Sequence, residues 1–255
     1  MNKQISLKHL LAATILMGAV ALASCAAAPA AVISAPAFTQ AAQQVNTTSA
    51  IANVDDRGNT SVDLAALNTA LNQVATSKLT SAEAEALSYM REEEKLAHDV
   101  YLALDEEWGL QIFKNISSSE QTHTDSVKTL LDRYGVTDPA AGKAAGVFSA
   151  PKLQDLYNKL VEQGRKSLAD ALRVGGAIEE IDILDLQERI ARTDKADIRL
   201  VYDNLMKGSR NHLRSFTSTL KTQTGATYQP QYLSQDAYQA IVSSTIEKGG
   251  PGGRP

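Results

Sequence analysis

The sequence contains a single cysteine, Cys25, in 255 residues. One thiol cannot form an intramolecular disulfide, and it cannot build a metal or redox motif that needs several cysteines. Aromatic residues are also scarce, at 5% of the chain, whereas alanine and leucine recur throughout. A core of this composition is built more readily from interdigitating helices than from sheets of aromatic and β-branched residues. The composition therefore favours an all-α protein.

Neither sign of charge dominates, because 25 basic side chains stand against 29 acidic ones, for a net charge of −4. Binding to nucleic acid requires clustered lysine and arginine that displace counterions, so we expect no nucleic-acid partner. The sequence also lacks a glycine-rich phosphate loop, a Gly-x-Ser-x-Gly elbow and a His-Glu-x-x-His motif. These absences argue against the nucleotide-binding, serine-hydrolase and zinc-protease sites that such motifs build.

The N-terminal residues have the features of an export signal. Two early lysines precede an apolar run at residues 10–23. The run is shorter than the roughly 20 residues that span a bilayer, which favours a cleavable signal over a permanent membrane helix. It ends in Leu22-Ala23-Ser24-Cys25, which resembles the lipobox of bacterial lipoproteins. The alternative is an ordinary signal peptide cleaved near Ala28.

The lipobox resemblance implies that residues 1–25 form a lipoprotein signal peptide. A lipid on Cys25 would then anchor the protein to a membrane of the bacterial cell envelope, on the periplasmic or extracellular face. Residues 26–77 are rich in Ala, Ser, Thr, Gln and Pro, and this composition predicts a disordered tether, with a short helix conceivable at 63–74. We expect the folded domain at residues 78–248 and a flexible tail at 249–255.

From residue 80 onward, apolar residues recur at steps of three and four, the period of an amphipathic helix. This pattern predicts four long helices, at residues 80–109, 117–134, 166–193 and 196–222. Two shorter helices are expected at residues 151–163 and 233–246. Thr80 and Glu83 can form a capping box at the first start, and Gly109 ends that helix. No segment shows the sustained alternation of a half-buried strand, so we expect no sheet.

The lengths of the connections indicate how the four helices are arranged. Some thirty residues, including a short helix, separate the second long helix from the third, whereas the other connections are short. A bundle with one long crossover of this kind is the ferritin-like arrangement, not the simple up-down-up-down one. The sequence therefore predicts an all-α, ferritin-like four-helix bundle with a long crossover between helices 2 and 3.

Several charged residues fall at positions that should face the core of this bundle. Burying a charge is costly unless the charge is paired or bound to metal, so these residues are candidate metal ligands. They are Glu94, Glu120, His123, Glu180 and His212. Glu120 and His123 stand three residues apart on one helix face, where a carboxylate and an imidazole can meet one ion. Taken singly, each residue also fits a plainer role, such as a solvated helix face for Glu94 or a satisfied interior histidine for His212.

Four local strings carry a resemblance to a known superfamily. REEEKLAHDVY, NISSSEQTH, IEEIDILDL and GSRNHLRSF follow one another on the four predicted long helices. Their glutamates and histidines resemble the dinuclear metal centre of ferritin-like proteins. The strings look closer still to an uncharacterised prokaryotic family of unknown function within that superfamily, over residues 80–245. The resemblance implies two iron ions as cofactor, with manganese as the alternative metal.

The sequence departs from the superfamily pattern at Ser209, where a second Glu-x-x-His would place a carboxylate. Glu179 and Asp182 are the candidates to replace that ligand, and His98 and Tyr101 are candidates to stand beside the ligands. Fewer anionic ligands weaken the binding of a pair of divalent ions. An asymmetric pair, a single metal ion and a centre that has lost its ions therefore all stay open.

Two functions of different classes follow from these residues. The first is an iron- or manganese-dependent oxidoreductase of the cell envelope that acts on ferrous ion, dioxygen or peroxide. The second is a non-catalytic bundle that binds metal or presents a helical surface to an envelope partner. In a variant of the second function, the inward carboxylates and histidines pair only with each other as a buried polar network. A homodimer is compatible with either.

Overall fold

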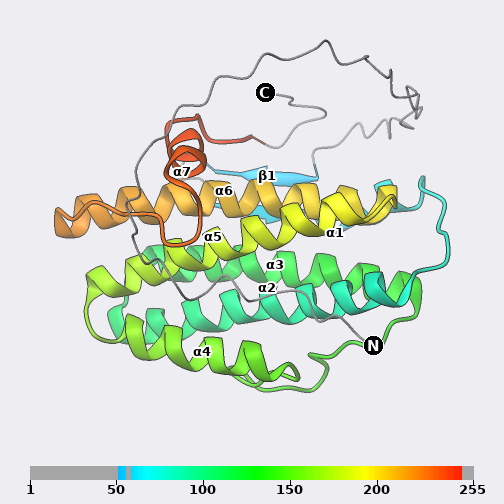
Figure 1. Ribbon diagram of the computed structural model, residues 1–255, viewed down its shortest axis with the longest axis horizontal. Helices are drawn as coiled ribbons and strands as arrows, with labels where there is room; N and C mark the ends of the chain where they lie inside the picture. Colours follow the sequence, from blue (N-terminus) through cyan, green and yellow to red (C-terminus); the bar gives the residue numbers. More distant parts are fainter. Residues whose placement is uncertain (1–50, 56–58, 249–255) are drawn as a thin grey trace, which may run out of the picture. The chain divides into compact units, whose positions relative to one another are not determined.

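The computed structural model describes residues 51–55 and 59–248. These residues are mostly helical, which confirms the predicted all-α character of the domain. Four long helices form a bundle (Figure 1): α2 (Ser81–Trp108), α3 (Gln111–Tyr134), α5 (Leu168–Arg192) and α6 (Ala196–Thr224). Short connections join α2 to α3 and α5 to α6, so each pair runs antiparallel. None of the described helices is both long and apolar enough to cross a bilayer.

The predicted signal peptide, Cys25 and the first part of the predicted tether lie within residues 1–50, outside the described residues, as does the predicted tail at 249–255.

The start and end of α2 follow the predicted capping chemistry. Thr80 Oγ1 accepts a hydrogen bond from the backbone N–H of Glu83 (3.2 Å), and the Glu83 carboxylate accepts one from the N–H of Thr80 (2.8 Å). Gly109, at φ 59°, takes the left-handed conformation that ends the helix. α3 then begins at Gln111, well before the predicted residue 117, and buries Phe113 in its first turn. Its N-cap residue is Leu110, whose side chain cannot accept a hydrogen bond, so no capping signal marks this start.

The long crossover between α3 and α5 contains α4 (Pro151–Gly164), as predicted at 151–163. α4 packs against α2 and α5 (Figure 1). The Glu92 carboxylate of α2 accepts hydrogen bonds from the backbone N–H groups of Ser149 and Ala150, and so satisfies donors at the start of α4. At the C-terminal end of α4, Nε1 of Trp108 on α2 donates a hydrogen bond to the carbonyl of Gly164 (3.0 Å). These contacts fix α4 over the side of the bundle where α2 meets α5.

The prediction of a disordered tether at residues 26–77 is wrong for its C-terminal part. β1 (Ala52–Val54) and β2 (Thr60–Val62) pair antiparallel, with Ala52 opposite Val62, so the expectation of no sheet is also wrong. α1 (Leu64–Leu71) follows, with Asp63 as the N-cap whose side chain accepts from two backbone N–H groups. The few apolar residues of this segment, among them Leu67, are buried in the same cluster as core residues of α2, α3 and α6. The amino-acid composition of the segment does not reveal such docking, because the docking depends on an apolar surface that the bundle provides.

The apolar residues of α5 do not all face the core. Leu184 is 38% exposed, whereas Ile183 and Leu186 are buried. The helix is buried on a second side as well, because the segment after α6 docks on it and leads into α7 (Gln235–Val242). Apolar residues therefore occur around much of α5, and their period alone does not define which face meets the other three long helices.

Candidate metal centre

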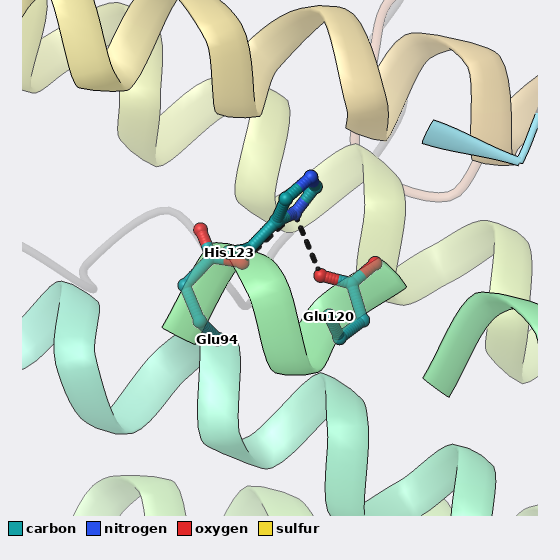
Figure 2. A group of neighbouring side chains, drawn as sticks. All are labelled: Glu94, Glu120 and His123. Atoms are coloured by element: carbon teal, nitrogen blue, oxygen red, sulfur yellow. Dashed lines mark ion pairs between the residues drawn. The ribbon is translucent and has the colours of Figure 1, made fainter. Parts of the chain in front are cut away.

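Glu120 lies at the middle of a fully buried cluster of carboxylates and imidazoles. On its own helix, α3, its Oε2 lies 2.9 Å from Nδ1 of His123, one turn away (Figure 2). Its other oxygen, Oε1, lies 2.8 Å from Nδ1 of His212 on α6. The two oxygens of one carboxylate thus each face a different imidazole. The two rings stack with their centroids 5.6 Å apart.

Two further carboxylates flank this central trio. Glu94 of α2 places Oε2 at 3.4 Å from Nδ1 of His123, and Glu179 of α5 places Oε2 at 3.6 Å from Nδ1 of His212. The result is two triads that share Glu120. In each triad, one ligand atom from every residue lies within 4.8 Å of the others. All four long helices contribute.

The chemistry of these residues fits a divalent metal ion. Each triad offers two carboxylates and one imidazole, a donor set that suits iron, manganese and similar ions. Oε1 of Glu94 has no hydrogen-bond partner among the described residues, although it is buried. A buried polar atom without a partner is costly, and a bound ion would satisfy it. The centre could therefore hold a metal ion, and Glu120 belongs to both triads.

Without metal, protons balance the charges of the centre. Burial alone would raise the pKa of Glu120, but the neighbouring charges of His123 and His212 outweigh it and hold that pKa well below its usual range. Burial raises the pKa of Glu94 to about 7. Burial disfavours a charged His212, yet Glu179 and Glu120 raise its pKa to about 9. Protonated imidazoles thus supply the positive charge that metal ions would otherwise bring.

The backbone of α6 positions His123. A Cβ added at Gly208 would stand 2.4 Å from Cε1 and 2.6 Å from Nε2 of the ring, so a side chain there is sterically excluded. The imidazole therefore rests its Nε2 edge on the α6 backbone and turns Nδ1 toward Glu120. Tyr101 has a similar effect on Glu179, because its hydroxyl donates to Oε1 at 2.6 Å and leaves Oε2 near His212.

A small cavity opens beside the triads, on the side of the bundle that faces α4. Its volume is about 10 Å³, close to the space of one water molecule. Both acidic and apolar residues line it. The acidic residues are Glu93, Glu94, Glu120, Glu179 and Asp182, and the apolar ones are Leu96, Ala97, Leu156, Ile178 and Ile181.

Comparison with known proteins assigns the chain to a family. Residues 83–245 match the family described as an uncharacterized protein domain, DUF2202. The chain belongs to this family. The uncharacterized protein MJ0754 of Methanocaldococcus jannaschii is 56% identical over 167 residues, which are 66% of this chain and 90% of that relative. A crystal structure of hypothetical protein MJ0754 from Methanococcus jannaschii has a TM-score of 0.66 and 53% identity, and the match covers 68% of this chain and 99% of that one.

The family match includes the four-helix bundle of this DUF2202 protein but not the segment before it. Every residue of the two triads lies within residues 83–245. The β1–β2 hairpin and α1 lie outside the match. The candidate centre is thus part of the domain that defines the family.

Glu180, predicted as a ligand, lies outside both triads, and Glu179 stands in its place. The Glu180 carboxylate accepts hydrogen bonds from the Tyr228 hydroxyl (2.6 Å) and from the backbone N–H groups of Tyr232 (2.6 Å) and Leu233 (2.7 Å). Successive helical residues point about 100° apart, so Glu179 faces the centre whereas the segment after α6 buries Glu180.

The remaining predicted residues are placed around the triads. Tyr101 contacts Glu179, as described above, and Asp182 lines the cavity and accepts a hydrogen bond from Ser209. His98 belongs to neither triad. It is partly exposed, and its Nδ1 pairs with Asp99 (2.9 Å). Glu93, which the sequence pattern did not indicate as a site residue, is buried at 5% exposure. It sits in a run of charged residues that reads as a solvated helix face, and no local signal distinguishes it.

Proposed function

We propose that this DUF2202 protein holds a pair of iron ions, or an iron and a manganese ion, in a ferritin-like bundle. The observation that carries the proposal is the position of Glu120, whose two oxygens approach Nδ1 of two different histidines. Glu120 would therefore help to hold an ion in either triad. Glu94 and His123 would complete one set of ligands, and Glu179 and His212 the other. Two antiparallel helix pairs with a single long crossover support the ferritin-like arrangement.

The activity that we propose is oxidation of ferrous ion or reduction of dioxygen or peroxide. The bound ions would supply the redox chemistry. The chain's own residues would exclude bulk water, since all five proposed ligands are at least 98% buried. The hydrogen bond from Tyr101 keeps one oxygen of Glu179 occupied and leaves the other for an ion. A cavity of about 10 Å³ beside the ligands favours a reactant not much larger than water.

Metal analysis after anaerobic loading tests the proposal. The purified chain should bind ferrous ion, and admission of dioxygen or peroxide should change its optical spectrum. Glu120→Ala should lose both ions together, because both triads share this residue. Absence of bound iron and manganese in the wild type, with Glu120→Ala indistinguishable from it, would remove the proposal.

A second candidate function is a non-catalytic bundle that binds metal, or that presents a surface to an envelope partner. The observation that favours it is Ser209, which supplies a hydroxyl where a carboxylate ligand would complete the superfamily pattern, and which hydrogen-bonds to Asp182. A chain that binds metal without turnover of dioxygen or peroxide would support this function. Thermal stability that responds to neither metal nor chelator would instead indicate a buried polar network.

We also propose that the protein is exported and anchored through a lipid on Cys25 to a membrane of the bacterial cell envelope. The lipobox-like residues 22–25 motivate this proposal. It places the metal chemistry outside the cytoplasm. Labelling of growing cells with a fatty-acid analogue tests it, since the wild type should incorporate the label and Cys25→Ser should not.

A further inference from the structure

A row of carboxylates runs along α5 away from the centre. Glu179, Asp182 and Asp185 recur at every third residue, so neighbouring members of the row lie about one turn apart and the row winds gradually around the helix. Their exposure changes along the row: Glu179 is 1% exposed and Asp182 6%, whereas the side chain of Asp185 is 30% exposed. The row thus connects one of the proposed ligands to the surface of the protein.

Glu93 of α2 lies opposite this row. It is 95% buried, and no N–H or hydroxyl group in the described part of the chain donates to its carboxylate oxygens, whose one hydrogen-bonding neighbour is the carboxyl group of Asp185. Its principal charged neighbours are Asp185, Asp182 and Arg189. Carboxylates that are buried close together without partners are costly unless a proton or a cation is shared between them. Glu93 and the α5 row therefore form an acidic site with unsatisfied oxygens.

Asp182 joins this acidic site to the centre. One of its oxygens accepts the hydrogen bond from Ser209, and the other, Oδ1, has no partner among residues 51–55 and 59–248. Asp182 and Glu93 line the same cavity as Glu94, Glu120 and Glu179. An ion held between Glu93 and Asp182 would therefore have ligands of the centre on the same cavity wall.

Arg189 does not neutralise this acidic site. Its guanidinium lies over the ring of Tyr89, with 4.7 Å from Cζ to the ring centroid. Its nearest approach to the row is 3.8 Å, from Nη2 to Asp185 Oδ2, which makes at most a weak ion pair. One arginine faces three carboxylates, so it leaves carboxylate oxygens available to a cation.

We propose that Glu93 and Asp182 form a holding site for a divalent cation, reached from the surface past Asp185, from which the centre is loaded. Oxygen-only ligands suit hard divalent ions such as ferrous or manganous ion, which keep some of their water on binding. The inference rests on the proposed metal centre, but it concerns residues outside both triads. It gives a role to Glu93, whose buried carboxyl group is not explained by packing of the core.

Loading of the full, metal-free chain with Co²⁺, followed by visible absorption in stopped flow and by metal analysis at saturation, tests the inference. Wild type should bind one more Co²⁺ per chain than Glu93→Gln. Glu93→Gln and Asp185→Asn should fill the centre about tenfold more slowly, in the range seen when groups around a metal site are changed. Glu188→Gln is the matched control, because Glu188 lies on α5 with its side chain 45% exposed and paired with Arg192. It should load like wild type.

The outcomes separate the two proposals. If wild type, Glu93→Gln and Asp185→Asn bind the same number of ions at the same rate, the holding site is refuted while the centre stands. If wild type binds no Co²⁺ at all, both proposals fail. Circular dichroism of each variant confirms that the fold is retained, and the isosteric Glu93→Gln preserves the volume of the buried side chain.

Discussion

Gly208 of α6 lies directly against the ring of His123 of α3, so close that a Cβ on Gly208 would stand 2.4 Å from Cε1. The backbone of one helix is thus the wall that orients a proposed ligand of another. Gly208→Ala should push the imidazole away from Glu120 and Glu94. We expect a loss of about 1–3 kcal/mol in the free energy of unfolding from overpacking, and weaker binding of the ion held by Glu94 and His123.

Gly164→Ala is the control for this change. A Cβ at Gly164 would stand 2.5 Å from Cδ2 of Leu104, an equally tight contact between two residues that are each ten or more positions from every residue of the triads. Both variants should lose stability in chemical denaturation, but only Gly208→Ala should change a metal titration. Equal effects of the two variants on metal binding would show that Gly208 acts through general stability and not through His123.

The stability of the metal-free chain should depend on pH in a particular direction. Glu94 and His212 both hold a proton more tightly in the folded chain, with pKa values of about 7 and about 9 against usual values of 4.5 and 6.5. A raised folded pKa adds stability at low pH that is lost as the pH rises through the folded pKa. The Tm measured with excess chelator should therefore fall between about pH 5 and 9. The lowered pKa of Glu120 has the opposite effect on stability, but this effect appears only at acidic pH, below the usual pKa of a glutamate.

Added metal should oppose this fall in Tm with rising pH. A metal ion competes with the protons of the centre, so it binds more tightly as the pH rises and these protons dissociate. The rise in Tm on adding Mn²⁺ should be larger at pH 8 than at pH 6. Glu94→Gln cannot titrate and should flatten the lower part of the metal-free profile. A metal-free Tm that rises between pH 6 and 8 would contradict the assigned protonation of the centre.

The sequence predicts much of this centre because the proposed ligands interrupt otherwise apolar helix faces. Glu94, Glu120, His123 and His212 all occupy positions that periodicity assigns to the core, and the structure buries all four. The spacing of apolar residues along α5 does not determine whether Glu179 or Glu180 faces the centre. Both are buried, one in the centre and the other beneath residues 228–233, and the second contact joins positions about fifty residues apart. Periodicity within a helix carries no information on such a contact.

Glu180 should be a structural residue, in contrast with its predicted role. Its carboxylate accepts hydrogen bonds from the Tyr228 hydroxyl and from backbone N–H groups of the segment that follows α6. Glu180→Ala leaves these buried donors without a partner, which costs about 1–3 kcal/mol for each unsatisfied group. We expect a large loss of stability in urea denaturation with unchanged metal stoichiometry per folded chain. Glu188→Ala, an exposed change on the same helix, should stay within about 0.5 kcal/mol of wild type.

The segment around α1 offers a test of how far the folded domain extends. Leu67 has no exposed surface and packs with apolar residues of α2, α3 and α6, although the composition around it is typical of a disordered tether. If α1 unfolds together with the bundle, Leu67→Ala should cost about 2–5 kcal/mol, the range for truncating a buried leucine. Thr69→Ala, on the exposed side of the same helix, controls for effects on α1 itself. A Leu67→Ala variant as stable as Thr69→Ala, with early proteolytic cleavage near α1 in both, would show that this segment docks only weakly. Equal stability would then place the cooperative unit within the family match at residues 83–245.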